Sequence, residues 1–111
     1  MGFFVIPQRW ITPAITAAAL TFGPIPGDEP VRIHYFNFPS PGNAGTSQPN
    51  HIFLDKRSST YWRKWRAQCV IVHQYGHLRN RKDSPKPTSI MHNPQTRESC
   101  LPYLRRHGLL R

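Results

Sequence analysis

Residues 72–91 read VHQYGHLRNRKDSPKPTSIM, and this stretch contains two histidines four positions apart. An α-helix turns by about 100° per residue, so His73 and His77 would lie one turn apart on the same helix face. Two imidazoles with this spacing bind a single metal ion in many zinc sites. The stretch therefore predicts a helix that carries two metal ligands.

A third ligand is expected from the residues that follow the second histidine. Asp83 stands six residues after His77, beyond a break in helical character at Asn80–Lys82. A chain that turns back there can bring the Asp83 carboxylate to the two imidazoles. Two histidines and one carboxylate would leave the fourth position of a tetrahedral zinc site open, as in catalytic zinc sites.

This spacing resembles the signature of the metzincin zinc endopeptidases, which reads HExxHxxGxxH or, in the small secreted proteases similar to snapalysin, HExxHxxGxxD. The residues at the corresponding positions are His73, Gln74, His77, Asn80 and Asp83. Ser89-Ile90-Met91 resembles the Met-turn of that class, which lies beneath the metal. The resemblance implies a zinc ion held by the two histidines and the aspartate, with Met91 below them.

Two residues depart from the signature. Asn80 replaces the glycine, which is a mild change because asparagine tolerates the left-handed backbone that ends such a helix. Gln74 replaces the glutamate, which in these enzymes takes a proton from the attacking water and gives it to the leaving amine. A carboxamide does not titrate, and loss of a general base typically slows a reaction by about 100- to 10,000-fold. The resemblance therefore implies a protease's metal site without its base, with Gln74 either natural or introduced to silence an active enzyme.

The chain of 111 residues is expected to form one domain, residues 1–111, with a modest core. Twelve prolines and seven glycines indicate short elements joined by ordered loops, and three Trp, four Tyr and six Phe provide large side chains to bury. With the resemblance, this predicts an α+β domain of zincin/metzincin-like fold. It would have a short mixed sheet packed on a central zinc-binding helix, plus an N-terminal and a C-terminal helix.

The chain carries fifteen Lys and Arg against five Asp and Glu, which gives a formal net charge of +10. Such a charge attracts nucleic acid, anionic membranes or acidic protein surfaces. The basic residues gather at Arg63–Arg66, Arg79–Lys86 and Arg97–Arg111, so a positive rim around the metal cleft is expected. A solvated basic surface without a ligand is an equally good interpretation.

Cysteines and terminal signals place further expectations on the chain. Cys69 and Cys100 are the only cysteines, and they either form a bridge between the central and final helices or remain two buried thiols.

The start, MGFFVIPQRW, lacks the pattern of a secretory signal or a myristoylation motif. Eighteen apolar residues never run together, so no membrane span is expected. We expect a protein that is intracellular, packaged into a particle, or exported by a route that this sequence does not show.

Local patterns predict the elements that precede the metal motif. Phe3–Ile6 is expected to form a strand, and a helix is expected over Ala14–Leu20, with Thr12 as its cap and Pro13 at its first position. Alternation predicts a strand at Val31–Phe38, in which His34 is a partly exposed strand residue. Residues 39–50 are rich in Pro, Gly, Ser and Asn, and are predicted to form a long loop.

His51–Asp55 is predicted to form the strand before the metal-binding helix. The resemblance implies that this strand is the sheet edge that pairs with an extended substrate, through Ile52, Phe53 and Leu54. An edge strand without a ligand is the alternative.

The central helix is predicted at Ser59–Arg79, capped by one of the hydroxyl residues at its start, and apolar on most sides. Buried histidines and a buried glutamine need partners, which a metal or backbone hydrogen bonds would supply. His92 is held as a substitute third ligand. A final helix is predicted at Ser99–His107, with Ser99 as its cap.

Three functions compete on these observations. The first is a zinc-dependent endopeptidase scaffold that binds peptide or protein substrates and is nearly inactive because of Gln74. The second is a non-enzymatic component of a larger assembly, such as a virus particle, in which zinc stabilises the fold. The third is nucleic-acid binding through the basic rim, with Tyr61, Trp62 and Trp65 for stacking. It ranks last because these aromatics are expected on the buried stripe of the central helix.

Overall fold

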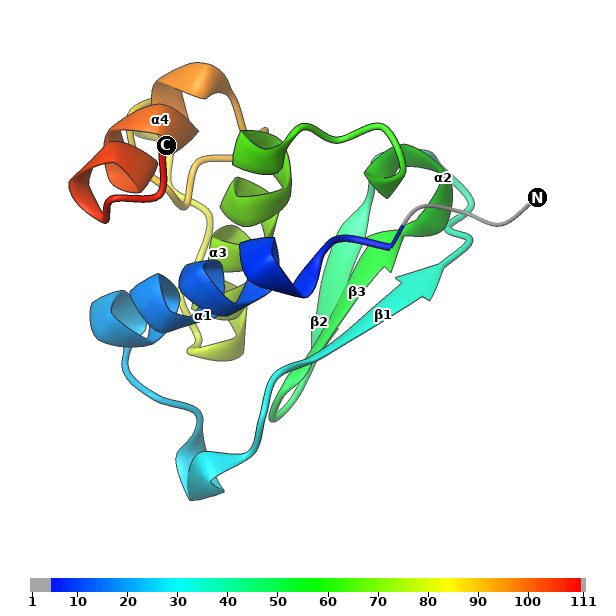
Figure 1. The fold of residues 1–111 in the computed structure, drawn as a ribbon, viewed down its shortest axis with the longest axis horizontal. Helices are drawn as coiled ribbons and strands as arrows, with labels where there is room; N and C mark the ends of the chain where they lie inside the picture. The colour runs from blue at the N-terminus through cyan, green and yellow to red at the C-terminus, as the bar shows by residue number, and fades with distance from the viewer. Residues whose placement is uncertain (1–4, 111) are drawn as a thin grey trace.

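The structure, a computed structural model, describes residues 5–110. Helices cover one face of a three-stranded mixed sheet, which confirms the predicted α+β class (Figure 1). In chain order the elements are α1 (Gln8–Phe22), a 3-10 turn (Pro26–Asp28), β1 (Arg32–Phe36), β2 (Ala44–Ser47), β3 (His51–Asp55), α2 (Lys56–Ser59), α3 (Lys64–Leu78) and α4 (Arg97–Arg106).

The strands lie in the order β1-β3-β2. β1 runs parallel to β3, with Ile33 opposite Ile52, and β2 runs antiparallel to β3, with Thr46 opposite Ile52. The strand predicted at His51–Asp55 is confirmed, whereas the one predicted at Val31–Phe38 is shorter. β2 lies within the predicted loop, because its sequence AGTS contains no large apolar residue that would reveal a strand.

The position of β3 contradicts one prediction about the site. β3 is the central strand, and its Ile52 and Leu54 are fully buried, so Ile52, Phe53 and Leu54 do not form a sheet edge. The edge that contacts α3 belongs to β2, and no other strand among the described residues pairs with its outer side. The prediction failed because a strand hidden in a polar stretch is inserted beside β3.

The first helix begins earlier than predicted, at Gln8 rather than after Thr12. The carbonyl of Pro7 accepts hydrogen bonds from the next turn, so one turn forms before Pro13, whose missing N–H removes a single bond near the helix start. Of the strand predicted at Phe3–Ile6, Phe3 and Phe4 lie outside the described residues, and Val5 and Ile6 are not in a strand. Small side chains on the buried face of α1 allow it to pack against α3; they are Ala14, Ala17 and Ala18.

The helix predicted at Ser59–Arg79 is divided in two. Asp55, rather than a hydroxyl residue, caps α2 by accepting a hydrogen bond from the Ser58 N–H at 3.0 Å. Arg63 then adopts an extended backbone, so α3 begins only at Lys64. From Ala67 to Gly76 every residue of α3 is buried, which agrees with a helix that is apolar on most sides.

The final helix begins at Arg97 and is capped by Thr96 rather than Ser99. Thr96 and Ser99 form a reciprocal capping box, in which each side-chain oxygen accepts a hydrogen bond from the other's backbone N–H. A disulfide between Cys69 and Cys100 joins α3 to α4, with the two Cα atoms 5.6 Å apart. Of the two alternatives for the cysteines, the structure contains the bridge.

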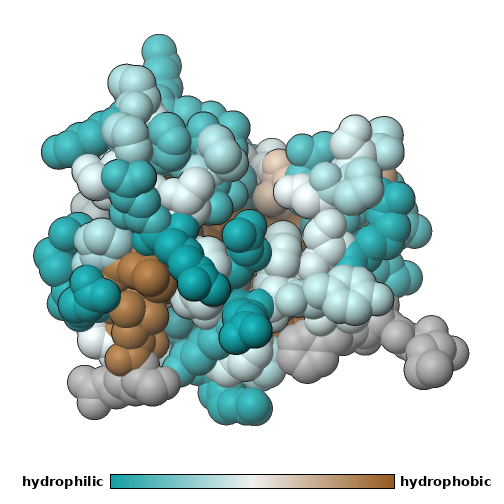
Figure 2. All heavy atoms as spheres, turned by 90° about the horizontal axis from the view of Figure 1, so that it is seen from above, coloured by the Kyte–Doolittle hydropathy of each residue, from teal (hydrophilic) through white to brown (hydrophobic). Residues whose placement is uncertain are grey.

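One face of the molecule, seen after a 90° turn from the view of Figure 1, is mainly polar. Hydrophilic side chains dominate that face, and one compact hydrophobic patch interrupts them (Figure 2). None of the helices within residues 5–110 has the length and apolar character that a membrane crossing requires.

Candidate metal centre

Three predicted ligands converge at the C-terminal end of α3. The Nε2 atoms of His73 and His77 lie 3.1 Å apart, and Asp83 Oδ1 lies 3.1 Å from the first and 3.0 Å from the second. Ligands about 2.0–2.1 Å from a tetrahedral zinc ion are separated from each other by about 3.3 Å. The three atoms therefore form a group that could hold one metal ion.

Backbone carbonyls fix the orientation of both imidazoles. The Nδ1 atom of His73 lies 2.9 Å from the Ile90 carbonyl oxygen, and that of His77 lies 2.8 Å from the Arg81 carbonyl oxygen. Because a carbonyl only accepts, each neutral ring carries its hydrogen on Nδ1 and directs the lone pair of Nε2 toward the other ligands. Two lone pairs and a carboxylate oxygen that converge in this way could hold a metal ion, and nitrogen and carboxylate ligands are those found in zinc sites.

The end of α3 explains how Asp83 reaches the histidines. The Asn80 N–H donates to the His77 carbonyl at 3.0 Å, and the Arg81 N–H donates to the Gly76 carbonyl at 2.9 Å. These two bonds form a Schellman motif, in which the first residue after the helix cap has a left-handed backbone. Asn80 supplies it with φ 65°, as the sequence predicted. The reversal also brings the Arg81 carbonyl to His77.

A second contact fixes the segment that carries Asp83. Ser84 forms a parallel bridge with His92, and its N–H donates to the Met91 carbonyl at 2.9 Å. The His92 ring turns toward the Ser84 carbonyl, 3.0 Å from its Nδ1, and His92 is not part of the ligand group. The prediction that His92 could substitute as the third ligand is therefore not supported, because its ring is engaged with the backbone beside Asp83.

The predicted Met-turn, Ser89–Met91, packs against the helix turn that joins the two histidines. Met91 is 6% exposed, and a Cβ atom added to Gly76 would overlap its sulfur and lie 3.0 Å from its Cε. Ile90, the residue before Met91, provides the carbonyl that orients His73. The segment thus supports the centre in two ways, by packing under α3 and by fixing a ligand ring.

The surroundings of His73 favour its metal-binding form. Burial lowers the pKa of His73 below its ordinary value, and the neighbouring His77 lowers it further. The hydrogen bond to Ile90 and the Asp83 carboxylate act in the opposite direction but do not outweigh burial. The lowered pKa favours the neutral imidazole, which has a lone pair for a metal.

A cleft of about 270 Å³ opens beside the three ligands. Its lining includes residues 42–46, which comprise the start of β2 and the two residues before it, and also Asn93 and Gln95 from the segment after Met91. Gln74 lies between the ligands on α3 and also lines the cleft, with 7% of its surface exposed. The predicted base position therefore faces the same space as the metal ligands.

No protein family, characterised protein or solved structure matches this chain. The interpretation of the centre therefore depends on its own geometry.

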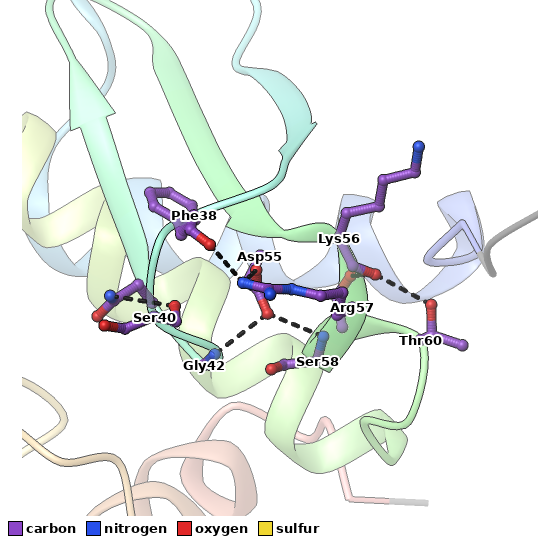
Figure 3. Close-up of polar contacts among 10 residues, drawn as sticks. Phe38, Ser40, Gly42, Asp55, Lys56, Arg57, Ser58 and Thr60 are labelled. Atoms are coloured by element: carbon purple, nitrogen blue, oxygen red, sulfur yellow. Dashed lines mark hydrogen bonds and ion pairs between the residues drawn. The ribbon is translucent and has the colours of Figure 1, made fainter.

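Asp55 is a positioning residue that sequence reasoning missed. Its side chain is fully buried, and its Oδ2 accepts hydrogen bonds from the Gly42 N–H at 3.1 Å and from the Ser58 N–H (Figure 3). The Arg57 guanidinium lies 3.4 Å from Oδ1 and donates to the Phe38 carbonyl. Burial raises the pKa of Asp55, but hydrogen bonds involving Ser58 and Gly42, together with Arg57, outweigh burial and lower this pKa well below its usual range.

This network fixes the loop that leads into β2, and so one wall of the cleft. An acidic residue at the end of a predicted strand, followed by KRSS, is the sequence signal that could have identified it as a helix cap.

One of the three aromatic residues near the start of α3 is not where the sequence predicted it. Trp62 and Trp65 are half-buried and pack against the core, as expected for the apolar stripe. Tyr61 is 85% exposed, so its expected place on the buried stripe is wrong, because it lies in the break between α2 and α3.

Proposed function

We propose that the chain is a metzincin-like zinc peptidase scaffold that binds peptides but cleaves them very slowly. The observation that carries this proposal is the convergence of two imidazole nitrogens and a carboxylate in a cleft beside an open strand edge. His73, His77 and Asp83 would hold the metal. A zinc ion bound there would act as a Lewis acid that polarises the carbonyl of the scissile peptide bond.

Gln74 determines which step of peptide hydrolysis is lost. Its carboxamide reaches the cleft next to the ligands and can orient a water molecule by hydrogen bonds. It cannot take the proton of that water, because an amide does not titrate near neutral pH. The chain therefore keeps the binding functions of a peptidase and lacks the proton transfer.

The edge of β2 is the proposed binding surface for the peptide backbone. β2 lines the cleft, and its outer side is free of strand pairing within the described part of the chain. An extended peptide can add to such an edge as a further strand, with main-chain hydrogen bonds providing affinity. This proposal replaces the predicted role of Ile52, Phe53 and Leu54 in β3.

Metal binding is tested on the purified full-length chain by native mass spectrometry and zinc titration. We expect one zinc ion per chain, and at least about a 100-fold loss of affinity in His77→Ala, because removal of a ligand exceeds the 10- to 100-fold effect of outer-shell changes. His34→Ala is the matched control, since His34 contacts His51 and Phe53 on the sheet. Equal losses in both variants would contradict the ligand assignment.

The catalytic proposal is tested by restoring the carboxylate. Gln74→Glu should raise the zinc-dependent cleavage of an unfolded protein substrate by about 100- to 10,000-fold over the unaltered chain. Gln95→Glu is the control, because it places the same charge in the same cleft at a different position. Zinc binding without any gain in cleavage would reject the peptidase scaffold.

That last outcome would favour the second candidate, a non-enzymatic protein that uses zinc to stabilise its fold. Gln74 is the observation that favours this candidate, because neither metal binding nor folding requires a titrating group at that position. Zinc would then raise the unfolding temperature without any associated hydrolysis, including in Gln74→Glu.

A further inference from the structure

A second hollow, separate from the metal cleft, lies at the N-terminal end of α3. Its volume is about 240 Å³. It is formed by three aromatic and three basic residues: Tyr61, Trp62, Arg63, Trp65, Arg66 and Arg97. We call it the arginine–aromatic hollow. Trp65 precedes His73 by eight residues, so the hollow begins about 12 Å along the helix axis from the nearer metal ligand.

Two of the three guanidinium groups in the hollow lie over an aromatic ring. Arg66 lies over the Trp65 ring at 5.0 Å from its centroid, and Arg97 at 5.5 Å. A cation–π contact of this kind does not neutralise the positive charge, and a guanidinium has five N–H donors for further partners. None of the ion pairs formed within residues 5–110 involves Arg63, Arg66 or Arg97. The hollow therefore contains three positive charges without an internal counter-charge.

The start of α3 adds to this positive potential. The first turn of the helix contains no acidic residue, and the Arg63 side chain does not cap its backbone N–H groups. The N-terminal end of a helix carries a partial positive charge. Both features favour an anionic ligand over a cationic one.

Tyr61 indicates which kind of anion fits. Its ring is 85% exposed beside the guanidinium groups, an unusually large apolar exposure for an aromatic side chain. Single-stranded nucleic acid alternates phosphates with flat bases, and proteins bind it with basic grooves and aromatic stacking surfaces. An acidic peptide would match the charges but would leave the exposed ring without a flat partner.

We propose that the arginine–aromatic hollow binds single-stranded nucleic acid. Phosphates contact the N–H edges of Arg63, Arg66 and Arg97, and a base stacks on Tyr61. This site does not depend on the proposed peptidase function, and binding should persist in the zinc-deficient His77→Ala variant.

The stacking contact is tested with a fluorescently labelled single-stranded oligonucleotide of mixed sequence, by anisotropy with the full-length chain. Tyr61→Ala should weaken binding by about 5- to 100-fold, the effect of one lost base stack, whereas Tyr61→Phe should retain most of the affinity. The exposure of Tyr61 means that neither change disturbs the core.

The phosphate contacts are tested by the double variant Arg66→Gln/Arg97→Gln. Each lost phosphate contact should reduce the salt slope of binding by about 0.7, so the double variant should lose about 1.4. The matched control is Arg32→Gln/Arg105→Gln, which removes the same charge from two exposed arginines outside the hollow. Equal weakening in both double variants would overturn the proposal in favour of a diffuse charge effect.

A binding measurement with polyglutamate in place of the oligonucleotide distinguishes a site for nucleic acid from a site for acidic polypeptides. The proposal expects polyglutamate to bind more weakly and to be insensitive to Tyr61→Ala. If polyglutamate binds as tightly as the oligonucleotide, and Tyr61→Ala affects neither ligand, the hollow is a surface for acidic polypeptides and the proposal is wrong.

Discussion

Met91 packs directly against Gly76, at the helix turn that separates the two histidine ligands. No side chain of any size fits at position 76 while Met91 keeps its place, because an added Cβ would overlap the sulfur and also lie 3.3 Å from Phe22. The candidate ligands and the segment that carries Met91 are therefore packed together through a glycine in the last turn of α3.

Gly76→Ala should destabilise the protein by about 1–2 kcal/mol and weaken zinc binding. The overlap with Met91 costs about 1–3 kcal/mol, because this side chain is 6% exposed and has little room to shift, and it outweighs the gain of about 0.5–1 kcal/mol from replacing a helical glycine. Urea unfolding and zinc titration measure the two effects. Gly45→Ala is the control, since an added Cβ at that position meets nothing within 4 Å. Equal stability of the two variants would contradict the close packing of Met91.

Asn80→Val should lower both the unfolding free energy and the zinc affinity. The left-handed backbone at Asn80 costs an ordinary residue about 1–2 kcal/mol, and a β-branched residue tolerates it least. The same reversal places Asp83 at the metal centre, so strain there should reach the ligand group. Glycine adopts this backbone readily, so Asn80→Gly should have an unfolding free energy equal to or above that of the unaltered chain, measured by chemical denaturation. If valine were as well tolerated as glycine, the Schellman motif would not control the position of Asp83.

Asp55 should make stability depend on acid pH. The pKa of Asp55 in the folded protein lies below the value of about 3.9 in an unfolded chain, so the unfolded state binds protons first as the pH falls. Its contribution is therefore complete above about pH 5 and is lost as the pH falls through 3.9 toward the folded pKa. Urea unfolding between pH 7 and pH 3 measures this loss.

Asp55→Asn should cost about 1–3 kcal/mol at pH 7, because two backbone N–H groups lose a charged acceptor. The variant should also lose less stability between pH 5 and pH 3 than the unaltered chain. Ser40→Ala is a neighbouring control that leaves the carboxylate in place. An unchanged pH profile in Asp55→Asn would show that the network does not depend on the ionised acid.

Removal of the disulfide should lower the unfolding free energy by about 3–4 kcal/mol. The bridge closes a sequence separation of 31 residues, and the entropy that it removes from the unfolded chain scales with the logarithm of that length. The double variant Cys69→Ala/Cys100→Ala, compared with the unaltered chain under oxidising conditions, measures the effect. A reductant should destabilise the unaltered chain and leave the double variant unchanged.

The convergence of His73, His77 and Asp83 could be predicted because it depends on a short stretch of chain. His73 and His77 share a helix face by spacing alone, and Asn80 tolerates the backbone conformation that returns Asp83 to them. Their convergence needs only one helix and one turn. The α+β class followed in the same way from short elements with clear alternation, as at His51–Asp55.

The features that could not be predicted depend on contacts between distant residues. β2 has no apolar signal of its own and exists because β3 pairs with it. The break before Lys64 follows the short helix α2, which Asp55 caps. The sequence from Ser59 to Arg79 has a continuous helical pattern, so it gives no sign of this break. The edge strand and Tyr61 were therefore both misplaced, since the first error follows from β2 and the second from the break.

The disulfide has a consequence for limited proteolysis. All three candidate ligands and Met91 lie between Cys69 and Cys100, so the candidate centre is contained in one covalently closed ring. The turn at residues 85–88 is exposed and belongs to this ring. A single cut there would leave His73, His77 and Asp83 on one fragment and Ile90 and Met91 on the other, and the disulfide would hold the two fragments together until it is reduced.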